Sequence, residues 1–252
     1  MRGHAAVGFA VALLALAGCQ SRKPAAGPSA DASPARDKGP LCVGTAAAGM
    51  PHVLRGGGFT LPGGGGVRYT GASADGTTRT ATLADGARYR SGARQWTVRT
   101  GARLTVSGHA YTVRQICSYR VVLAPDDAEA RAALAAEPAS TRSSGGSADD
   151  GLCYTTNRSA LTAAGRGFPA EGQALPLVTN GGRRQFPTGW SIAVYFVSSA
   201  DGTAHLGASC AGIPAADYQD VATGDTVEFA GTLFRATVVG ASRSVTLTRL
   251  RS

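Results

Sequence analysis

Histidines and cysteines are the residues of this chain best suited to acid–base or nucleophilic chemistry. Beyond residue 40 the chain holds His52, His109 and His205, and Cys42, Cys117, Cys153 and Cys210. The best nucleophile and base that this set offers are Cys117 and His109, eight residues apart across a predicted hairpin. An imidazole beside a cysteine activates the thiol as a nucleophile. One thiol-based active site is therefore a hypothesis that the sequence allows.

The sequence also lacks the common short motifs of catalytic sites. It has no GxSxG, SxxK, HExxH or GxGxxG pattern. None of the four cysteines listed above lies in a CxxC or in a Cys/His zinc spacing. The sequence therefore predicts no catalytic set, no metal site and no cofactor.

The N-terminus has the features of an export signal. Arg2 precedes an apolar run over residues 5–17, which is shorter than the roughly 20 residues of a membrane-spanning helix. The run ends in Leu16-Ala17-Gly18-Cys19, which resembles the lipobox of bacterial lipoproteins position for position. The resemblance implies cleavage before Cys19 and thioether lipidation of its sulfur. A membrane partnership through Cys19 on the extracytoplasmic face of a cell membrane would follow.

In an exported protein, an even number of cysteines beyond residue 40 favours disulfides over free thiols. Three pairings of the four are possible. The pairs Cys42–Cys117 and Cys153–Cys210 are preferred because each then falls inside one copy of an internal repeat. A disulfide at Cys117 would remove the thiol that the enzyme hypothesis needs.

That repeat has three landmarks in the same order along the chain. Residues 98–113 align without gaps on residues 221–236, the Ser-Ala-Asp-Gly-Thr sequence at 73–77 recurs at 199–203, and Leu41-Cys42 recurs as Leu152-Cys153. Three ordered matches predict two copies of one structural unit.

Hydrophobic residues within the repeat alternate at period two, which is typical of strands with one buried face. Leu104 and Val106 in the first copy correspond to Val227 and Phe229 in the second, with polar neighbours between them. Gly108 and Gly231 are predicted to turn each pair into a hairpin. Asp75-Gly76 and Asp201-Gly202 are predicted as two-residue hairpin turns. Trp96 and Trp190 are predicted core residues.

The fold class that follows is all-β, with two tandem small antiparallel β-sandwich or half-barrel domains joined by a linker. We expect a signal peptide at 1–18, a disordered tether at 19–40, a first β domain at 41–124, an acidic linker at 125–150 and a second β domain at 151–252. Within the linker, residues 125–137 are predicted to form a short helix capped by Asp126 or Asp127. The glycines at 56–58 and 63–66 are predicted as flexible loops, because a strand and not a helix follows them.

Positive charge is concentrated in the first β domain. Residues 41–124 have a net charge of +8, against −4 for residues 125–150 and +2 for residues 151–252. A basic domain beside a membrane can attract anionic lipids or wall polymers. The predicted anionic-ligand surface consists of Arg88, Arg90, Arg99 and Arg103. The alternative is that these arginines are only solvated residues of a chain rich in Ala, Gly and Arg.

The leading functional hypothesis is a non-catalytic lipoprotein that binds an envelope partner protein or an anionic polymer. Nucleic acid is disfavoured as a partner by the compartment and by the lack of a basic motif interleaved with aromatic residues. Two alternatives stay open. One is an envelope hydrolase with an unrecognised active site, and the other is a structural spacer.

Overall fold

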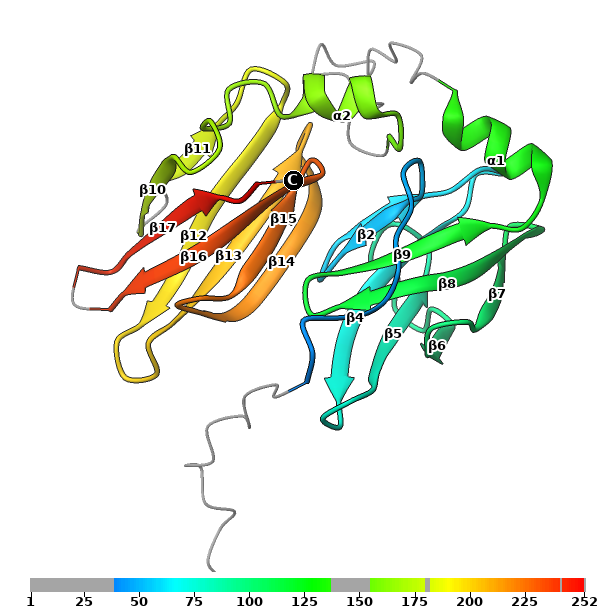
Figure 1. The fold of residues 1–252 in the computed structure, drawn as a ribbon, viewed down its shortest axis with the longest axis horizontal. Coiled ribbons are helices and arrows are strands. Elements are labelled where there is room, and N and C mark those ends of the chain that lie inside the picture. Colours follow the sequence, from blue (N-terminus) through cyan, green and yellow to red (C-terminus); the bar gives the residue numbers. More distant parts are fainter. Residues whose placement is uncertain (1–38, 137–154, 180–181, 241, 252) are drawn as a thin grey trace, which may run out of the picture. The chain divides into compact units, whose positions relative to one another are not determined.

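The computed structural model describes residues 39–136, 155–179, 182–240 and 242–251, all within one compact unit. The expected signal peptide and most of the expected tether and linker, with Cys19 and Cys153, lie outside the described residues. Among the described helices, none has the length and apolar character needed to cross a membrane. The described residues are mostly strand, so the all-β class is confirmed (Figure 1).

Residues 39–136 form two antiparallel sheets and one helix. One sheet has the order β3-β4-β5-β6, and the other has the order β1-β8-β9-β2 with β7 also paired to β8. The elements are β1 (Cys42–Gly44), β2 (His52–Leu54), β3 (Gly58–Thr60), β4 (Gly66–Ala74), β5 (Arg79–Asp85), β6 (Gln95–Val98), β7 (Arg103–Val106), β8 (His109–Cys117), β9 (Arg120–Pro125) and α1 (Ala128–Ala135).

Residues 155–251 also form two antiparallel sheets, of orders β11-β12-β13-β14 and β10-β17-β16-β15. The elements are α2 (Arg158–Ala164), β10 (Ala174–Val178), β11 (Arg183–Gln185), β12 (Trp190–Ser198), β13 (Thr203–Cys210), β14 (Ile213–Ala222), β15 (Thr226–Phe229), β16 (Thr232–Val239) and β17 (Ser244–Arg249).

The two halves share one strand connectivity. In chain order, β2 to β9 occupy the same sheet positions in the first half as β10 to β17 occupy in the second, and β1 is an addition to the first half. The repeat seen in the sequence is therefore also a repeat of topology. The division into two separately folding domains stays a prediction.

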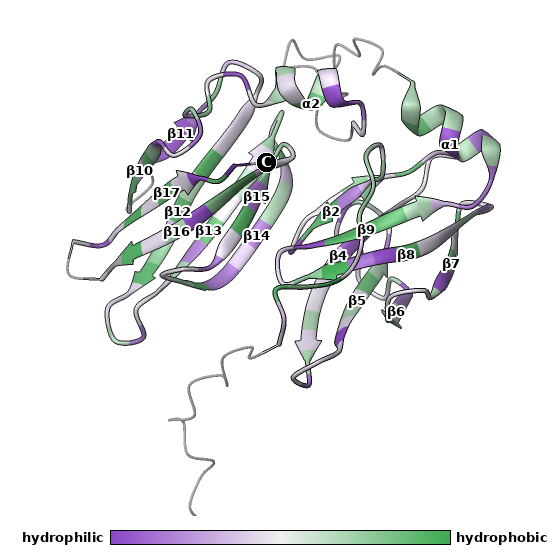
Figure 2. Ribbon diagram, in the orientation of Figure 1, coloured by the Kyte–Doolittle hydropathy of each residue, from purple (hydrophilic) through white to green (hydrophobic). Residues whose placement is uncertain are grey.

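Buried apolar side chains from both sheets of a half meet in a common core, as the alternating hydropathy of the strands suggests (Figure 2). The first half has its own cluster, which includes Tyr69, Leu83 and Tyr111. The cluster of the second half contains Trp190 and extends to Leu54, Cys117 and Tyr119 of the first half. Trp190 is a core residue as predicted, with 2% exposure. Trp96 is partly buried, and Arg94 lies 5.3 Å from its ring centroid.

The predicted hairpins form, and the turns predicted at Gly108 and Gly231 are confirmed. Ser107-Gly108 and Ala230-Gly231 are two-residue turns in which both residues have positive φ. The turns after β4 and β12 are four-residue loops, so the prediction of two-residue turns at Asp75-Gly76 and Asp201-Gly202 was wrong. The reason is visible at Asp75, whose side chain accepts a hydrogen bond from the Thr78 backbone N–H at 3.1 Å and so closes a wider loop.

The linker helix is confirmed, and a second helix was missed. Asp127 caps α1 by accepting from the Ala130 N–H at 2.7 Å. Asn157 caps α2 in the same way, accepting from the Ala160 N–H at 3.1 Å. Asn157 as a cap, the Ala-rich turn after it and Gly165 at its end are a sequence signal from which α2 could have been predicted.

The disulfide Cys42–Cys117 forms between β1 and β8, as preferred. Cys210 is also disulfide-bonded. Its predicted partner, Cys153, lies outside the described residues, so the pairing Cys153–Cys210 stays a prediction.

The glycines at 56–58 are tightly packed, so the flexible-loop prediction for them was wrong. A Cβ at Gly57 would lie 1.8 Å from the Ala215 carbonyl oxygen, and a Cβ at Gly58 would lie 1.8 Å from the Ala87 carbonyl oxygen. These glycines let the chain after β2 approach the backbone of β14 and of the loop after β5.

Candidate anion-binding site

The two halves together line a cleft of about 690 Å³. This volume lies within the ~300–1,000 Å³ typical of small-molecule sites. We call it the arginine cleft. The first half contributes Arg55, Gly56, Gly58, Arg68, Thr70 and residues 87–89, and the second half contributes Ile213, Pro214, Asp217 and Gln219 from β14.

Strand geometry aims Arg68 at the cleft. In β4, Val67 and Tyr69 are fully buried in the core, so Arg68 between them lies on the opposite face. Its cross-strand neighbours are Gly58 on β3 and Ala84 on β5, which are both small and leave space for a long side chain. Arg68 Nη1 is buried and makes no hydrogen bond to any described residue.

Arg55 and Arg88 approach the same cleft from two other segments. Arg55 directly follows β2 and is held by its backbone: its N–H donates to the Tyr119 carbonyl at 2.9 Å, and its carbonyl accepts from the Asp217 N–H at 2.8 Å. Arg88 is exposed in the loop after β5. Within the described ranges, neither of these arginines nor Arg68 forms an ion pair with a carboxylate.

Tyr89 adds an aromatic wall to the cleft. The residue is 80% exposed, and the Arg68 guanidinium carbon lies 5.0 Å from its ring centroid. This distance is within the ~6 Å of a cation–π contact. The contact orients Arg68 and leaves most of the tyrosine surface accessible.

One carboxylate also faces the cleft, and a histidine holds it. Asp217 and Gln219 lie on one face of β14, since Tyr218 between them is buried. The Asp217 carboxylate forms a short contact with His205 Nε2 on β13. The Tyr195 ring packs edge-on against His205, with their centroids 5.0 Å apart.

An imidazole oriented by a carboxylate is one part of an acid–base site. Of the described residues lining the cleft, Thr70 and Tyr89 carry hydroxyl groups. Thr70 donates its own hydroxyl proton to the Thr82 carbonyl at 3.1 Å. His205 therefore has no serine or cysteine partner in the cleft lining, and its described contacts give it a role in holding Asp217.

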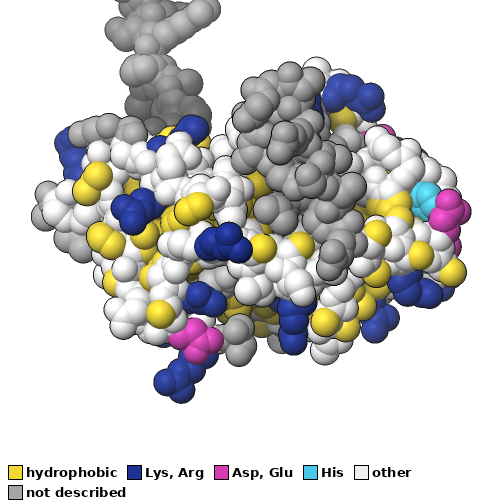
Figure 3. Space-filling view, turned by 90° about the horizontal axis from the view of Figure 1, so that it is seen from above, with side chains coloured by type: hydrophobic (Ala, Val, Ile, Leu, Met, Phe, Trp, Pro, Cys, Tyr) yellow, Lys and Arg dark blue, Asp and Glu magenta, His cyan; other side chains and the backbone are white. Residues whose placement is uncertain are grey.

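The four arginines of the predicted anionic-ligand surface occupy different environments. Arg88 lines the cleft. Arg90 lies 3.9 Å from Asp85, and Arg103 lies 3.6 Å from Asp126. Arg99 is exposed and lowers the pKa of Asp75 slightly, after the larger effect of hydrogen bonds from Thr78. On the face shown in Figure 3, basic side chains are spread among neutral and hydrophobic ones.

The thiol hypothesis fails on the structure. Cys117 is in a disulfide, and it lies at the opposite end of β8 from His109 and not across a hairpin from it. Eight residues of extended strand separate the two by roughly 26 Å. His109 Nδ1 instead lies 3.2 Å from the Asp127 carboxylate at the start of α1. The backbone N–H of Ala130, and to a smaller extent His109, lower the pKa of Asp127.

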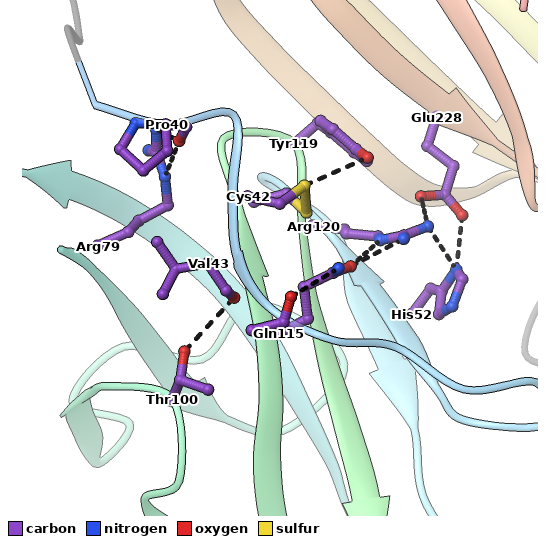
Figure 4. Close-up of a disulfide and its surroundings, with 12 residues drawn as sticks. Pro40, Cys42, Val43, His52, Arg79, Thr100, Gln115, Tyr119, Arg120 and Glu228 are labelled. Atoms are coloured by element: carbon purple, nitrogen blue, oxygen red, sulfur yellow. Dashed lines mark hydrogen bonds and ion pairs between the residues drawn. A yellow bond between two sulfur atoms is a disulfide. The ribbon is translucent and has the colours of Figure 1, made fainter. Parts of the chain in front are cut away.

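A second polar cluster joins the two halves around the fully buried Glu228. The Glu228 carboxylate in β15 accepts from Arg120 Nη1 at 2.8 Å and lies 2.7 Å from His52 Nδ1 (Figure 4). Arg120 also donates to the Gln115 side-chain oxygen at 2.8 Å. The Tyr218 hydroxyl donates to the Glu228 carbonyl at 3.0 Å.

Opposing effects set the charge of Glu228. Burial alone raises its pKa, but the charges and hydrogen bonds of His52 and Arg120 outweigh burial, so the pKa lies below its ordinary value of 4.5. Burial together with the Glu228 charge raises the pKa of Tyr218 well above 10. The cluster therefore holds an ionised carboxylate and a neutral phenol in the protein interior.

The sequence pattern predicts an exposed position for Glu228. Its neighbours Val227 and Phe229 face the core, so period-two alternation places Glu228 on the solvent side. Its counterpart in the first copy of the repeat, Thr105, is indeed exposed. All four residues of β15 are buried, because strands of the first half cover the second face of β15.

The sequence also did not distinguish the arginines of the cleft from the other arginines. Arg55 and Arg68 were two of ten arginines in residues 41–124, and no motif singled them out. His, Cys, Asp and Glu side chains do not gather in threes around a possible metal position within the part of the chain that the structure describes. No family model, no curated protein and no solved structure matches this chain.

Proposed function

We propose that this protein is a lipid-anchored extracytoplasmic binding protein whose arginine cleft takes an anionic ligand of the cell envelope. The observation that carries the proposal is the convergence of Arg55, Arg68 and Arg88 on one pocket without a carboxylate partner among the described residues. A guanidinium offers a planar fork of donors that matches a carboxylate or a phosphate.

Burial makes the case strongest for Arg68. A buried donor without a partner carries a desolvation cost of about 1–3 kcal/mol, and a bound anion would remove that cost. Asp217 offsets at most one of the three arginine charges of the cleft, and its described partner is His205. The cleft thus has a positive excess that an anionic ligand complements.

The membrane location rests on the sequence alone. The lipobox residues Leu16 to Cys19 support an anchor at Cys19, and the disulfide Cys42–Cys117 is consistent with an oxidising compartment. In cells, Cys19→Ser should move the protein from the membrane fraction to the soluble fraction and abolish incorporation of an alkyne-labelled fatty acid. Continued labelling of the variant would contradict the anchor.

The binding proposal is tested with the full chain in detergent against three labelled anionic polymers: polygalacturonate, polyphosphate and polyglutamate. Replacing Arg55, Arg68 and Arg88 with Gln should weaken the best-bound polymer at least about tenfold, and raised salt should weaken binding by the parent protein. The matched control replaces Arg90, Arg99 and Arg103 with Gln, which removes the same charge from other positions.

The two triple variants separate three outcomes. Loss in the cleft variant alone supports the proposal. Equal loss in both variants would assign binding to the general positive field of the first half, including the surface predicted from the sequence. No binding of any polymer by the parent protein would leave the spacer interpretation as the better one.

A further inference from the structure

The arginine cleft combines groups that a simple anion site does not need. Beside its three arginines it presents the exposed Tyr89 ring, the neutral side chains of Thr70 and Gln219, and the Asp217 carboxylate. A ligand that uses the whole cleft must offer an acidic group, a flat apolar face and hydroxyl donors together.

The Tyr89 ring is the first discriminating feature. A tyrosine that is 80% exposed is a large apolar surface in contact with water. Arg68 lies over the ring at 5.0 Å, so a ligand acid bound to Arg68 is held close to the aromatic surface. The axial C–H face of a pyranose ring packs well on such a surface, whereas a phosphate chain has no apolar face to offer.

Asp217 is the second discriminating feature. It stands in the same cleft as the arginines, and its short contact with His205 fixes its orientation. A carboxylate repels a densely charged polymer and accepts hydrogen bonds from hydroxyl groups. Gln219 lies two residues further along the same face of β14 and can both donate and accept.

We infer that the ligand of the arginine cleft is an acidic saccharide of the uronic acid type. Its carboxylate binds Arg68 with Arg55 or Arg88, its ring packs on Tyr89, and its hydroxyls bind Asp217 and Gln219. This inference rests on the proposed function and narrows it, and the cleft volume of about 690 Å³ is ample for a short oligosaccharide.

The test measures affinities of the full chain in detergent for trigalacturonic acid, for its methyl ester, and for polyphosphate and polyglutamate. The acid should bind, and the ester, which keeps the rings and loses the charge, should bind at least about tenfold more weakly. Tyr89→Ala should weaken trigalacturonic acid about tenfold and weaken any polyphosphate binding much less, whereas Tyr89→Phe should stay within about threefold of the parent protein for trigalacturonic acid. Arg68→Gln should weaken every anion.

Three results would overturn the inference, and they differ in what they say about the cleft. If polyphosphate or polyglutamate binds in a cleft-dependent way and the saccharide does not, the proposed function stands and the saccharide assignment fails. If Tyr89→Ala weakens all anions equally, the ring only supports Arg68 and the ligand is a simple anion. If no probe binds, both the inference and the proposed function fail.

Discussion

The carboxylate of Glu228 and the guanidinium of Arg120 lie 2.8 Å apart although 108 residues separate them in the sequence. Glu228 is fully buried, and the Arg120 side chain is 13% exposed. The pair connects β15 of the second half to β9 of the first, with His52 of β2 as a third member. The pair is therefore a charged link between the two halves.

Loss of the Glu228 charge should be costly at neutral pH. Glu228→Gln leaves Arg120 and His52 without their anion, so we expect the free energy of unfolding to fall by about 3–5 kcal/mol. Urea denaturation measures this difference. The control is Glu171→Gln, at an exposed glutamate, which should change the free energy by less than about 0.5 kcal/mol. Equal effects in the two variants would show that the buried pair makes no net contribution.

The same carboxylate predicts a pH dependence. Its native pKa lies below the value of 4.5 expected in the unfolded chain, so its contribution is fully present above about pH 4.5 and is lost as the pH falls through the native pKa. The difference in unfolding free energy between the parent protein and Glu228→Gln should therefore shrink as the pH falls below about 4.5. Urea midpoints across this range check the prediction, and a difference that stays constant would contradict it.

The disulfide between Cys42 and Cys117 should stabilise the protein strongly. It closes a sequence separation of 75 residues, so replacing both cysteines with serine should cost about 4 kcal/mol on the chain-entropy model. Intact-mass spectrometry after iodoacetamide treatment, without and with a reductant, shows which cysteines are held in disulfides. Cys42, Cys117 and Cys210 should react only after reduction, and alkylation of Cys117 in the unreduced protein would reopen the question of thiol chemistry.

The close approach at Gly57 should tolerate no side chain. A Cβ there would lie 1.8 Å from the Ala215 carbonyl oxygen, so Gly57→Ala must shift backbone and should destabilise the protein by about 1–3 kcal/mol or more. Gly71→Ala is the matched control, because nothing lies within 4 Å of a Cβ at Gly71 and its φ is not positive. Thermal unfolding of both variants measures the contrast, and equal stability would show that the contact yields easily.

Local information was enough for much of the fold. Period-two alternation predicted the hairpins around Gly108 and Gly231, and the Asp-rich start of the linker predicted α1. The repeat predicted the pairing of Cys42 with Cys117. These features depend on residues that are near one another in the sequence or related by the repeat, so the chain carries their signal directly.

Local patterns failed where a neighbouring element redefined a surface. The alternation of apolar residues places Glu228 on the polar face of β15, but β2 and β9 cover that face in the structure. The glycines at 56–58 were predicted as flexible loop residues, but β14 packs on their backbone. Hydrophobic periodicity reports which face of a strand is apolar, but it contains no information on what packs against the polar face.

The sequence by itself determined the strand content, the repeat and the predicted lipid anchor, because each is written in short segments. Only the tertiary structure decided which three of the ten arginines in residues 41–124 share a pocket. Arg55, Arg68 and Arg88 belong to three separate segments, and Asp217 reaches them from the other half. Their convergence depends on how the chain between them folds, and side-chain chemistry alone does not encode that path.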